Sequence, residues 1–216
     1  MASFKLTDDE LDGIVRVLAP QARALVAGYD GQKYPKDAYE ELVRAFMDPT
    51  TTSGGDIRRA LEWKYGHWGK ANYPQPHRDM AQRIWSRWGD FCSHLPLDPP
   101  GIFDFWMKAL EGRWTQPYIT VAFLLHLLRS SEFPIIDQFT YRAMNALVRK
   151  VQPDWDGKRT PSSYDDLLDY MAFFDGLLRV WPAGPGKPVR SRLDKALMVF
   201  GQGLKTSERH PGRRTQ

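Results

Sequence analysis

Apolar residues recur at three- and four-residue steps along most of this chain, a spacing that places them on one face of an α-helix. No stretch of useful length alternates between apolar and polar residues as a half-buried strand does. The clearest linker is the Pro- and Gly-rich segment 182–188. The pattern predicts an all-α protein of about nine helices near residues 8–18, 38–46, 57–65, 76–91, 101–110, 117–130, 138–151, 163–180 and 191–200.

Several predicted helices begin with a side chain that can accept hydrogen bonds from the free N–H groups of a first turn. Thr7 followed by Glu10 has the spacing of a capping box. Asp37 and Glu40 have the same spacing, and Asp56 is the expected N-cap of the helix after it. We therefore expect helices to start directly after these three capping residues.

The composition is that of a folded protein, because 42% of the 216 residues are hydrophobic and 26% are charged. This length suits one large domain or two small lobes with a shared core. The single Cys92 excludes an internal disulfide and a four-cysteine metal site, and the five histidines lack metal-ligand spacing. We expect no cofactor and no metal, no signal peptide, no membrane span, and a cytoplasmic, monomeric protein.

The basic charge of the chain is concentrated at one end. The pI is about 9.1 and the net charge is +4. Four cations and one anion from residue 204 onward give +3 there, so the remaining residues carry +1. We expect residues 204–216 to form a disordered basic tail, which either attracts phosphate loosely or is simply solvated. Net charge alone is therefore weak support for nucleic-acid binding.

The most informative segment is 133–142, which places Asp137 between an apolar run and a new helix. Pro134 favours extended backbone before it, and helix is expected from Gln138 onward. Asp137 then occupies an N-cap, a position that aspartate fills without any catalytic role. A carboxylate fixed in this way is also suited to stabilise a positively charged sugar transition state and to orient a water. The sequence leaves both interpretations open.

Residues 117–147 resemble the catalytic-aspartate segment of the helix-hairpin-helix DNA glycosylase superfamily. The apolar stretch 120–128 is similar to the helix that leads to the aspartate in that superfamily. Ile136 before Asp137 and Arg142 after it also match. The resemblance implies a two-lobed helical fold over residues 1–203, in which both chain ends contribute to one lobe. It also implies that Asp137 is catalytic and that double-stranded DNA is bound with one nucleotide flipped out.

Two departures change what the resemblance implies. The usual Leu-Pro-Gly-x-Gly hairpin is reduced to Gly112, so we expect Arg113 and Gln116 to replace its backbone contacts to phosphate. Members with lyase activity carry a lysine eighteen or nineteen residues before the aspartate. No lysine lies between Lys108 and Asp137. The implied enzyme is monofunctional: water cleaves the N-glycosidic bond and leaves an abasic site.

Aromatic and basic residues alternate in segment 61–70, which suits stacking on a base and contacts to phosphate. The same aromatic residues can equally pack in the core while the lysines lie in water. If the protein is a glycosylase, the residues expected to line its base pocket are Trp63, His67, Trp68 and Tyr118. The residues expected to contact DNA are Lys64, Lys70, Arg113, Gln116, Gln138, Arg142, Arg190 and Arg192.

Three hypotheses follow from the sequence. The first is a monofunctional DNA glycosylase that removes a damaged base in repair, or a hypermodified base of phage DNA in antiviral defence. The second is a non-catalytic DNA-binding protein on the same scaffold, in which Asp137 only caps a helix. The third is a helical protein-interaction module, which predicts no salt-dependent DNA binding.

Overall fold

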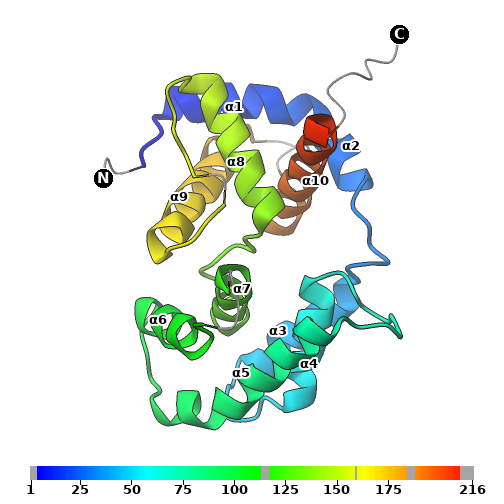
Figure 1. Ribbon diagram of the computed structural model, residues 1–216. Helices are drawn as coiled ribbons and strands as arrows, with labels where there is room; N and C mark the ends of the chain where they lie inside the picture. The colour runs from blue at the N-terminus through cyan, green and yellow to red at the C-terminus, as the bar shows by residue number, and fades with distance from the viewer. Residues whose placement is uncertain (1–3, 113–116, 159, 184–187, 210–216) are drawn as a thin grey trace. The chain divides into compact units, whose positions relative to one another are not determined.

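The computed structural model describes residues 4–112, 117–158, 160–183 and 188–209, and this part of the chain is all-helical, as predicted (Figure 1). The elements, in order, are α1 (Asp8–Leu18), the 3₁₀ turn η1 (Ala19–Gln21), α2 (Ala22–Ala27), α3 (Lys36–Phe46), α4 (Gly54–Lys64), α5 (Gln75–Ser93), α6 (Pro99–Ala109), α7 (Tyr118–Leu128), α8 (Gln138–Val151), α9 (Tyr164–Val180) and α10 (Arg190–Arg209). No helix within these ranges is long and apolar enough to cross a membrane.

The chain divides into two compact units. Unit 1 comprises Met1–Tyr29 and Pro134–Gln216, and unit 2 comprises Asp30–Phe133. In unit 1, α1 packs against α8 and α9, and α10 packs against α2 and α8. Figure 1 shows α10 beside both of these helices. Segments from both ends of the chain thus build unit 1, whereas unit 2 is one continuous stretch.

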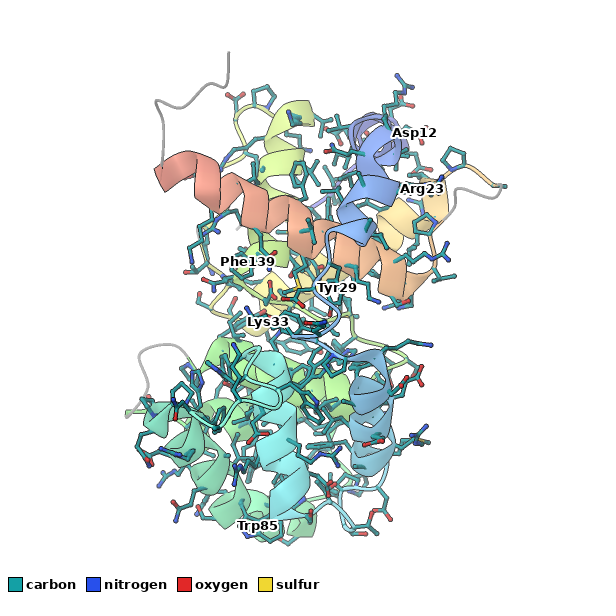
Figure 2. The ribbon with its side chains drawn as sticks, turned by 90° about the vertical axis from the view of Figure 1, so that its right-hand side faces the viewer. Asp12, Arg23, Tyr29, Lys33, Trp85 and Phe139 are labelled. Atoms are coloured by element: carbon teal, nitrogen blue, oxygen red, sulfur yellow. The ribbon has the colours of Figure 1, made fainter. Side chains whose placement is uncertain are left out.

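Each unit has its own apolar core. In unit 1, Ile14 of α1, Leu147 of α8 and Leu177 of α9 are completely buried. The core of unit 2 is aromatic: the Trp88 and Trp106 rings stack with centroids 5.5 Å apart. Burial of such side chains removes them from water and stabilises each unit by roughly 1.5–3 kcal/mol per large residue. The surface of unit 2 is not wholly polar, since about half of the Trp85 side chain on α5 is exposed (Figure 2).

The predicted N-cap of α1 is confirmed, and the predicted N-caps of α3 and α4 are wrong. Thr7 and Glu10 form the predicted capping box of α1. Asp37 is not an N-cap, because α3 already begins at Lys36 after Pro35 and Asp37 lies in its first turn. Asp56 is not an N-cap either: Ser53 caps α4, and Asp56 is the reciprocal partner three residues later.

The structure contains more helix than predicted in two places. The short helix α2 follows α1 after a single 3₁₀ turn, although no separate helix was expected there. Helix α10 runs to Arg209 instead of ending near residue 200. The segment expected to be a disordered tail from residue 204 therefore begins as helix, and residues 210–216 lie outside the described part of the chain.

Candidate functional site

Asp137 is the N-cap of α8, as predicted. Its backbone is extended, with φ −146° and ψ −179°, and the preceding Pro134 and Ile136 are buried. Its Oδ1 accepts hydrogen bonds from the backbone N–H groups of Phe139 at 2.7 Å and Thr140 at 2.9 Å. In return, the Asp137 N–H donates to Oγ1 of Thr140 at 2.9 Å. This capping box fixes the position and orientation of the carboxylate.

Only one of the two carboxylate oxygens takes part in the cap. Both amide hydrogen bonds end on Oδ1 of Asp137, and Oδ2 accepts no hydrogen bond and forms no ion pair with any residue that the structure describes. The side chain is also partly exposed. A carboxylate held by one oxygen keeps the other available for a water or a cationic group.

A buried tyrosine hydroxyl, that of Tyr170, interacts with Thr140 and Asp137 of the cap. Tyr170 of α9 is completely buried, and this burial raises the pKa of its hydroxyl well above the usual value. The negative charge of Asp194 raises this pKa further, the Thr140 hydroxyl opposes the change, and the charge of Asp137 adds to it. Tyr170 is therefore neutral at ordinary pH. No sequence motif marks Tyr170 or Asp194, because only the packing of α8, α9 and α10 brings them near Asp137.

The chain that leads to Asp137 is anchored in unit 2 by a residue that the sequence analysis did not single out. His126 of α7 is buried, and its Nδ1 lies 2.7 Å from the carbonyl oxygen of Phe133. Its Nε2 lies 2.7 Å from the Tyr39 hydroxyl. If Nδ1–H donates to the carbonyl, Nε2 accepts from Tyr39, so one neutral tautomer satisfies both contacts. These bonds fix Phe133, four residues before Asp137.

The four DNA-contact candidates of unit 1 fall into two groups. Gln138 and Arg142 lie in the first turns of α8, close to Asp137 in the chain. Arg190 lies at the start of α10, where its Nη1 binds Oδ1 of Asp175 at 2.6 Å, and Arg192 next to it is exposed. The guanidinium of Arg190 thus already has an acidic partner.

Two of the four expected pocket residues lie in the core of unit 2. Trp63 is 6% exposed, donates its indole N–H to the Pro35 carbonyl at 3.0 Å, and stacks on Phe123 with centroids 5.7 Å apart. Tyr118 is 2% exposed and meets the Phe103 ring edge-on at 5.7 Å. Both rings are covered by neighbouring side chains, which for Trp63 is the core alternative left open for segment 61–70.

The other candidates of unit 2 are dispersed. Lys64 is buried, and its ammonium group lies 5.2 Å from the centroid of the Phe123 ring. Trp68 is partly exposed beneath the Arg59 guanidinium, at 5.3 Å, and Lys70 is exposed. The structure does not bring Lys64 and Lys70 together on one surface. The remaining two candidates, Arg113 and Gln116, lie outside the described residues.

His67 belongs to a cluster of four rings between α4 and α5. Its ring centroid lies 5.3 Å from that of His77 and 5.7 Å from that of Tyr73. His77 also stacks on Tyr65 at 4.1 Å, and the Tyr65 hydroxyl bonds to Thr120 of α7. Burial lowers the pKa of both histidines; the positive charge of Lys70 lowers that of His67 further, and His67 lowers that of His77. Both imidazoles are therefore neutral near pH 7.

Two buried polar atoms of this cluster lack hydrogen-bond partners among the described residues. They are the hydroxyl oxygen of Tyr73, which is 2% exposed, and Nδ1 of His77. Unsatisfied buried groups cost free energy and are uncommon in folded proteins. The predicted pocket residue His67 therefore lies beside two residues whose buried polar atoms lack hydrogen-bond partners among the described residues.

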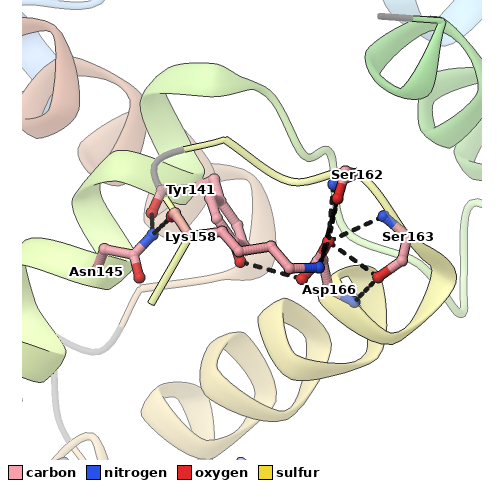
Figure 3. Close-up of polar contacts among 6 residues, drawn as sticks. All are labelled: Tyr141, Asn145, Lys158, Ser162, Ser163 and Asp166. Atoms are coloured by element: carbon pink, nitrogen blue, oxygen red, sulfur yellow. Dashed lines mark hydrogen bonds and ion pairs between the residues drawn. The ribbon is translucent and has the colours of Figure 1, made fainter. Parts of the chain in front are cut away.

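The other prominent polar cluster is structural (Figure 3). Asp166 of α9 is buried; its Oδ2 accepts from the backbone N–H groups of Ser162 at 2.7 Å and Ser163 at 2.9 Å, and binds Nζ of Lys158 at 3.1 Å. Burial alone would raise the pKa of this carboxyl, but these bonds hold it below its ordinary value. Asn145 ties the Lys158 carbonyl to α8. The network therefore fixes the connection between α8 and α9.

Comparisons with known proteins give no further guidance. No protein family, no curated protein and no solved structure matches this chain. Within the described ranges, no group of three or more His, Cys, Asp or Glu side chains is placed to hold a metal ion. The functional argument therefore rests on the residues themselves, and above all on Asp137.

Proposed function

We propose that the protein is a monofunctional DNA glycosylase whose catalytic residue is Asp137. The observation that carries this proposal is the one-sided cap of α8. Two amide hydrogen bonds hold Oδ1, and Oδ2 is left without a partner among the described side chains and backbone groups. The resemblance of residues 117–147 to the glycosylase superfamily supports the same assignment.

The chemistry assigned to Asp137 follows from this geometry. As the bond between C1′ and the base nitrogen breaks, its electrons leave with the base and positive charge develops on the sugar. A rigid carboxylate near the sugar stabilises this charge without reorganising during the reaction. Oδ2 can also accept the proton of a water that attacks C1′. The products are a free base, which takes up a proton, and an abasic site.

The remaining parts of the proposal concern recognition. The protein would bind double-stranded DNA as a cytoplasmic monomer and extrude one nucleotide. His67 and Trp68 stay predictions for base contacts, and each is only partly buried within unit 2. The base is either a damaged one, in DNA repair, or a hypermodified one in phage DNA, in antiviral defence. No lysine lies between Lys108 and Asp137, where superfamily members with lyase activity carry theirs, so strand cleavage through an imine is not expected.

One alternative has an observation in its favour. The capping box at Asp137 is complete, so a structural role accounts for this residue without catalysis. The protein would then be a non-catalytic DNA-binding protein. Loss of the Asp137 charge would leave DNA affinity unchanged in that case, and the parent protein would release no base.

The test is abasic-site formation in a panel of duplexes that carry oxidised, alkylated, deaminated and phage-type hypermodified bases, with alkaline strand cleavage as the readout. We expect the parent to produce alkali-labile sites in at least one duplex. DNA binding is measured on the same duplexes. Binding without product from any of them would favour the non-catalytic alternative. Absence of both would favour the protein-interaction module.

A further inference from the structure

The ring of Phe139, two residues after Asp137, lies close to two cations. Nζ of Lys205 on α10 is 5.4 Å from its centroid, and the guanidinium carbon of Arg142 on α8 is 6.0 Å from it. Phe139 is partly exposed, and Figure 2 shows its place on the ribbon. Both distances are within the range of cation–π attraction, which restricts the long basic side chains.

The close packing of α10 against α8 places Lys205 at this ring. A Cβ atom on Gly201 would lie 2.0 Å from the carbonyl oxygen of Phe139, so only glycine permits the observed approach of the two backbones. Lys205 is four residues further along α10 and therefore lies on the same helix face as Gly201. The contact between Gly201 and Phe139 thus determines where the Lys205 ammonium group lies.

Neither cation has a carboxylate partner in the part of the chain that the structure describes. Among the described residues, Lys205 and Arg142 form no ion pair, and Nη1 of Arg142 is buried without a hydrogen-bond partner. Other basic side chains of unit 1 differ in this respect. Arg190 pairs with Asp175, and Arg179 forms a bidentate pair with Asp8 at 2.7 and 2.8 Å. Two restrained cations at Phe139, without an acidic partner among the described side chains, are a suitable site for an anion.

We propose that Lys205 and Arg142, held on the Phe139 ring, bind a backbone phosphodiester of DNA next to the nucleotide on which Asp137 acts. Phosphate is the expected ligand because cations supply most of the contacts that position proteins on DNA. Restraint by the ring lowers the entropy lost when the side chains bind. The end of α10 is then part of the DNA-binding surface. This inference rests on the proposed function for the identity of the ligand.

The test is the salt dependence of binding to an unmodified, fluorescently labelled duplex, measured by anisotropy at several KCl concentrations. Each phosphate contact contributes about 0.9 to the slope of log K against log [salt]. We expect Lys205→Gln and Arg142→Gln each to lower the magnitude of this slope by about one unit. The matched control is Lys150→Gln, an exposed lysine near the other end of α8, which should leave the slope unchanged.

The aromatic ring is tested separately. Phe139→Leu keeps an apolar side chain and both cations but removes the cation–π contacts. We expect weaker binding with an unchanged slope, since the charges remain and only their restraint is lost. Circular dichroism spectra establish that each variant is folded. Lys205→Gln is the primary variant, because Lys205 lies near the end of α10 and is not fully buried.

The outcomes separate this inference from the proposed function. Equal slopes for the parent, Lys205→Gln and Arg142→Gln would overturn the phosphate site, and so would an equal loss in Lys150→Gln. Neither result would affect abasic-site formation, which is measured independently on the parent. A parent that shows no salt-dependent DNA binding would overturn both. A lowered slope in the two variants, with no base release by the parent, would retain the phosphate site and refute the glycosylase.

Discussion

Replacement of Gly201 by alanine tests whether the backbone contact between α10 and α8 is as close as the structure shows. The new methyl group would lie 2.0 Å from the carbonyl oxygen of Phe139 and 2.7 Å from its carbonyl carbon. Real Cβ atoms essentially never approach other atoms to within 3.0 Å. The obstacle is backbone, which cannot rotate away as a side chain can. The two helices must therefore move apart by about 1 Å or more.

Two opposing effects set the size of the change. Overpacking of a closely packed site costs about 1–3 kcal/mol, and a rigid backbone obstacle places this site in the upper half, about 2–3 kcal/mol. Alanine in place of glycine inside a helix restores about 1 kcal/mol. The net loss of unfolding free energy is about 1–2 kcal/mol. For a chain of this size, this corresponds to a fall in Tm of about 2–8 °C.

Gly203 provides a matched control on the same helix. It is exposed, and a Cβ atom added there would meet no atom within 4 Å. Gly203→Ala should therefore gain only the stability that the higher helix propensity of alanine provides, and its Tm should rise by up to about 4 °C. Thermal unfolding followed by far-UV circular dichroism measures both variants. A Tm for Gly201→Ala equal to or above that of Gly203→Ala would refute the close approach of α10 to Phe139.

Three further predictions concern the polar sites. At the cap of α8, Asp137→Ala should lower the unfolding free energy by about 0.5–2 kcal/mol. Asp137→Asn should change it little, because asparagine is also a competent N-cap. Urea titrations measure both variants. The unfolding free energy should fall as the pH drops below about 6.5, because the lowered pKa values of His67 and His77 let the unfolded chain bind more protons than the folded one. The double variant His67→Gln/His77→Gln should show a weaker decline, and an identical decline would disprove this origin. Asp166→Ala should destabilise the protein by about 2–3 kcal/mol, because the backbone N–H groups of Ser162 and Ser163 lose a charged, buried acceptor and Lys158 loses its ion-pair partner. A loss below about 1 kcal/mol would show that the network is dispensable.

Helix positions followed well from the sequence, because apolar periodicity and capping chemistry are local. The start of α8 after Asp137 is an example. At α4, both Ser53 and Asp56 are good capping residues, and the capping box assigns the cap to the first of the two. The length of α10 was not predictable in this way. Glycine commonly ends helices, but the packing of Gly201 against Phe139 retains it within the helix.

The sequence predicted those features of the candidate site that depend on residues close together along the chain. Asp137 and its role as a cap follow from the sequence, but the proximity of Tyr170 and Lys205 depends on how α8, α9 and α10 pack. Aromatic rings were the least predictable. Composition cannot distinguish a ring that stacks on a ligand from a core ring, and the structure places Trp63 and Tyr118 among core side chains.

The most direct test of the account compares base release by the parent, Asp137→Asn and Asp98→Asn under single-turnover conditions on the DNA panel. Asp98 caps α6 by accepting a hydrogen bond from the Gly101 N–H at 2.9 Å, so its replacement makes the same chemical change at another N-cap. The account predicts alkali-labile sites from the parent and from Asp98→Asn at similar rates, and none from Asp137→Asn, although all three bind DNA equally. Base release by Asp137→Asn at the parental rate would contradict the catalytic role of Asp137.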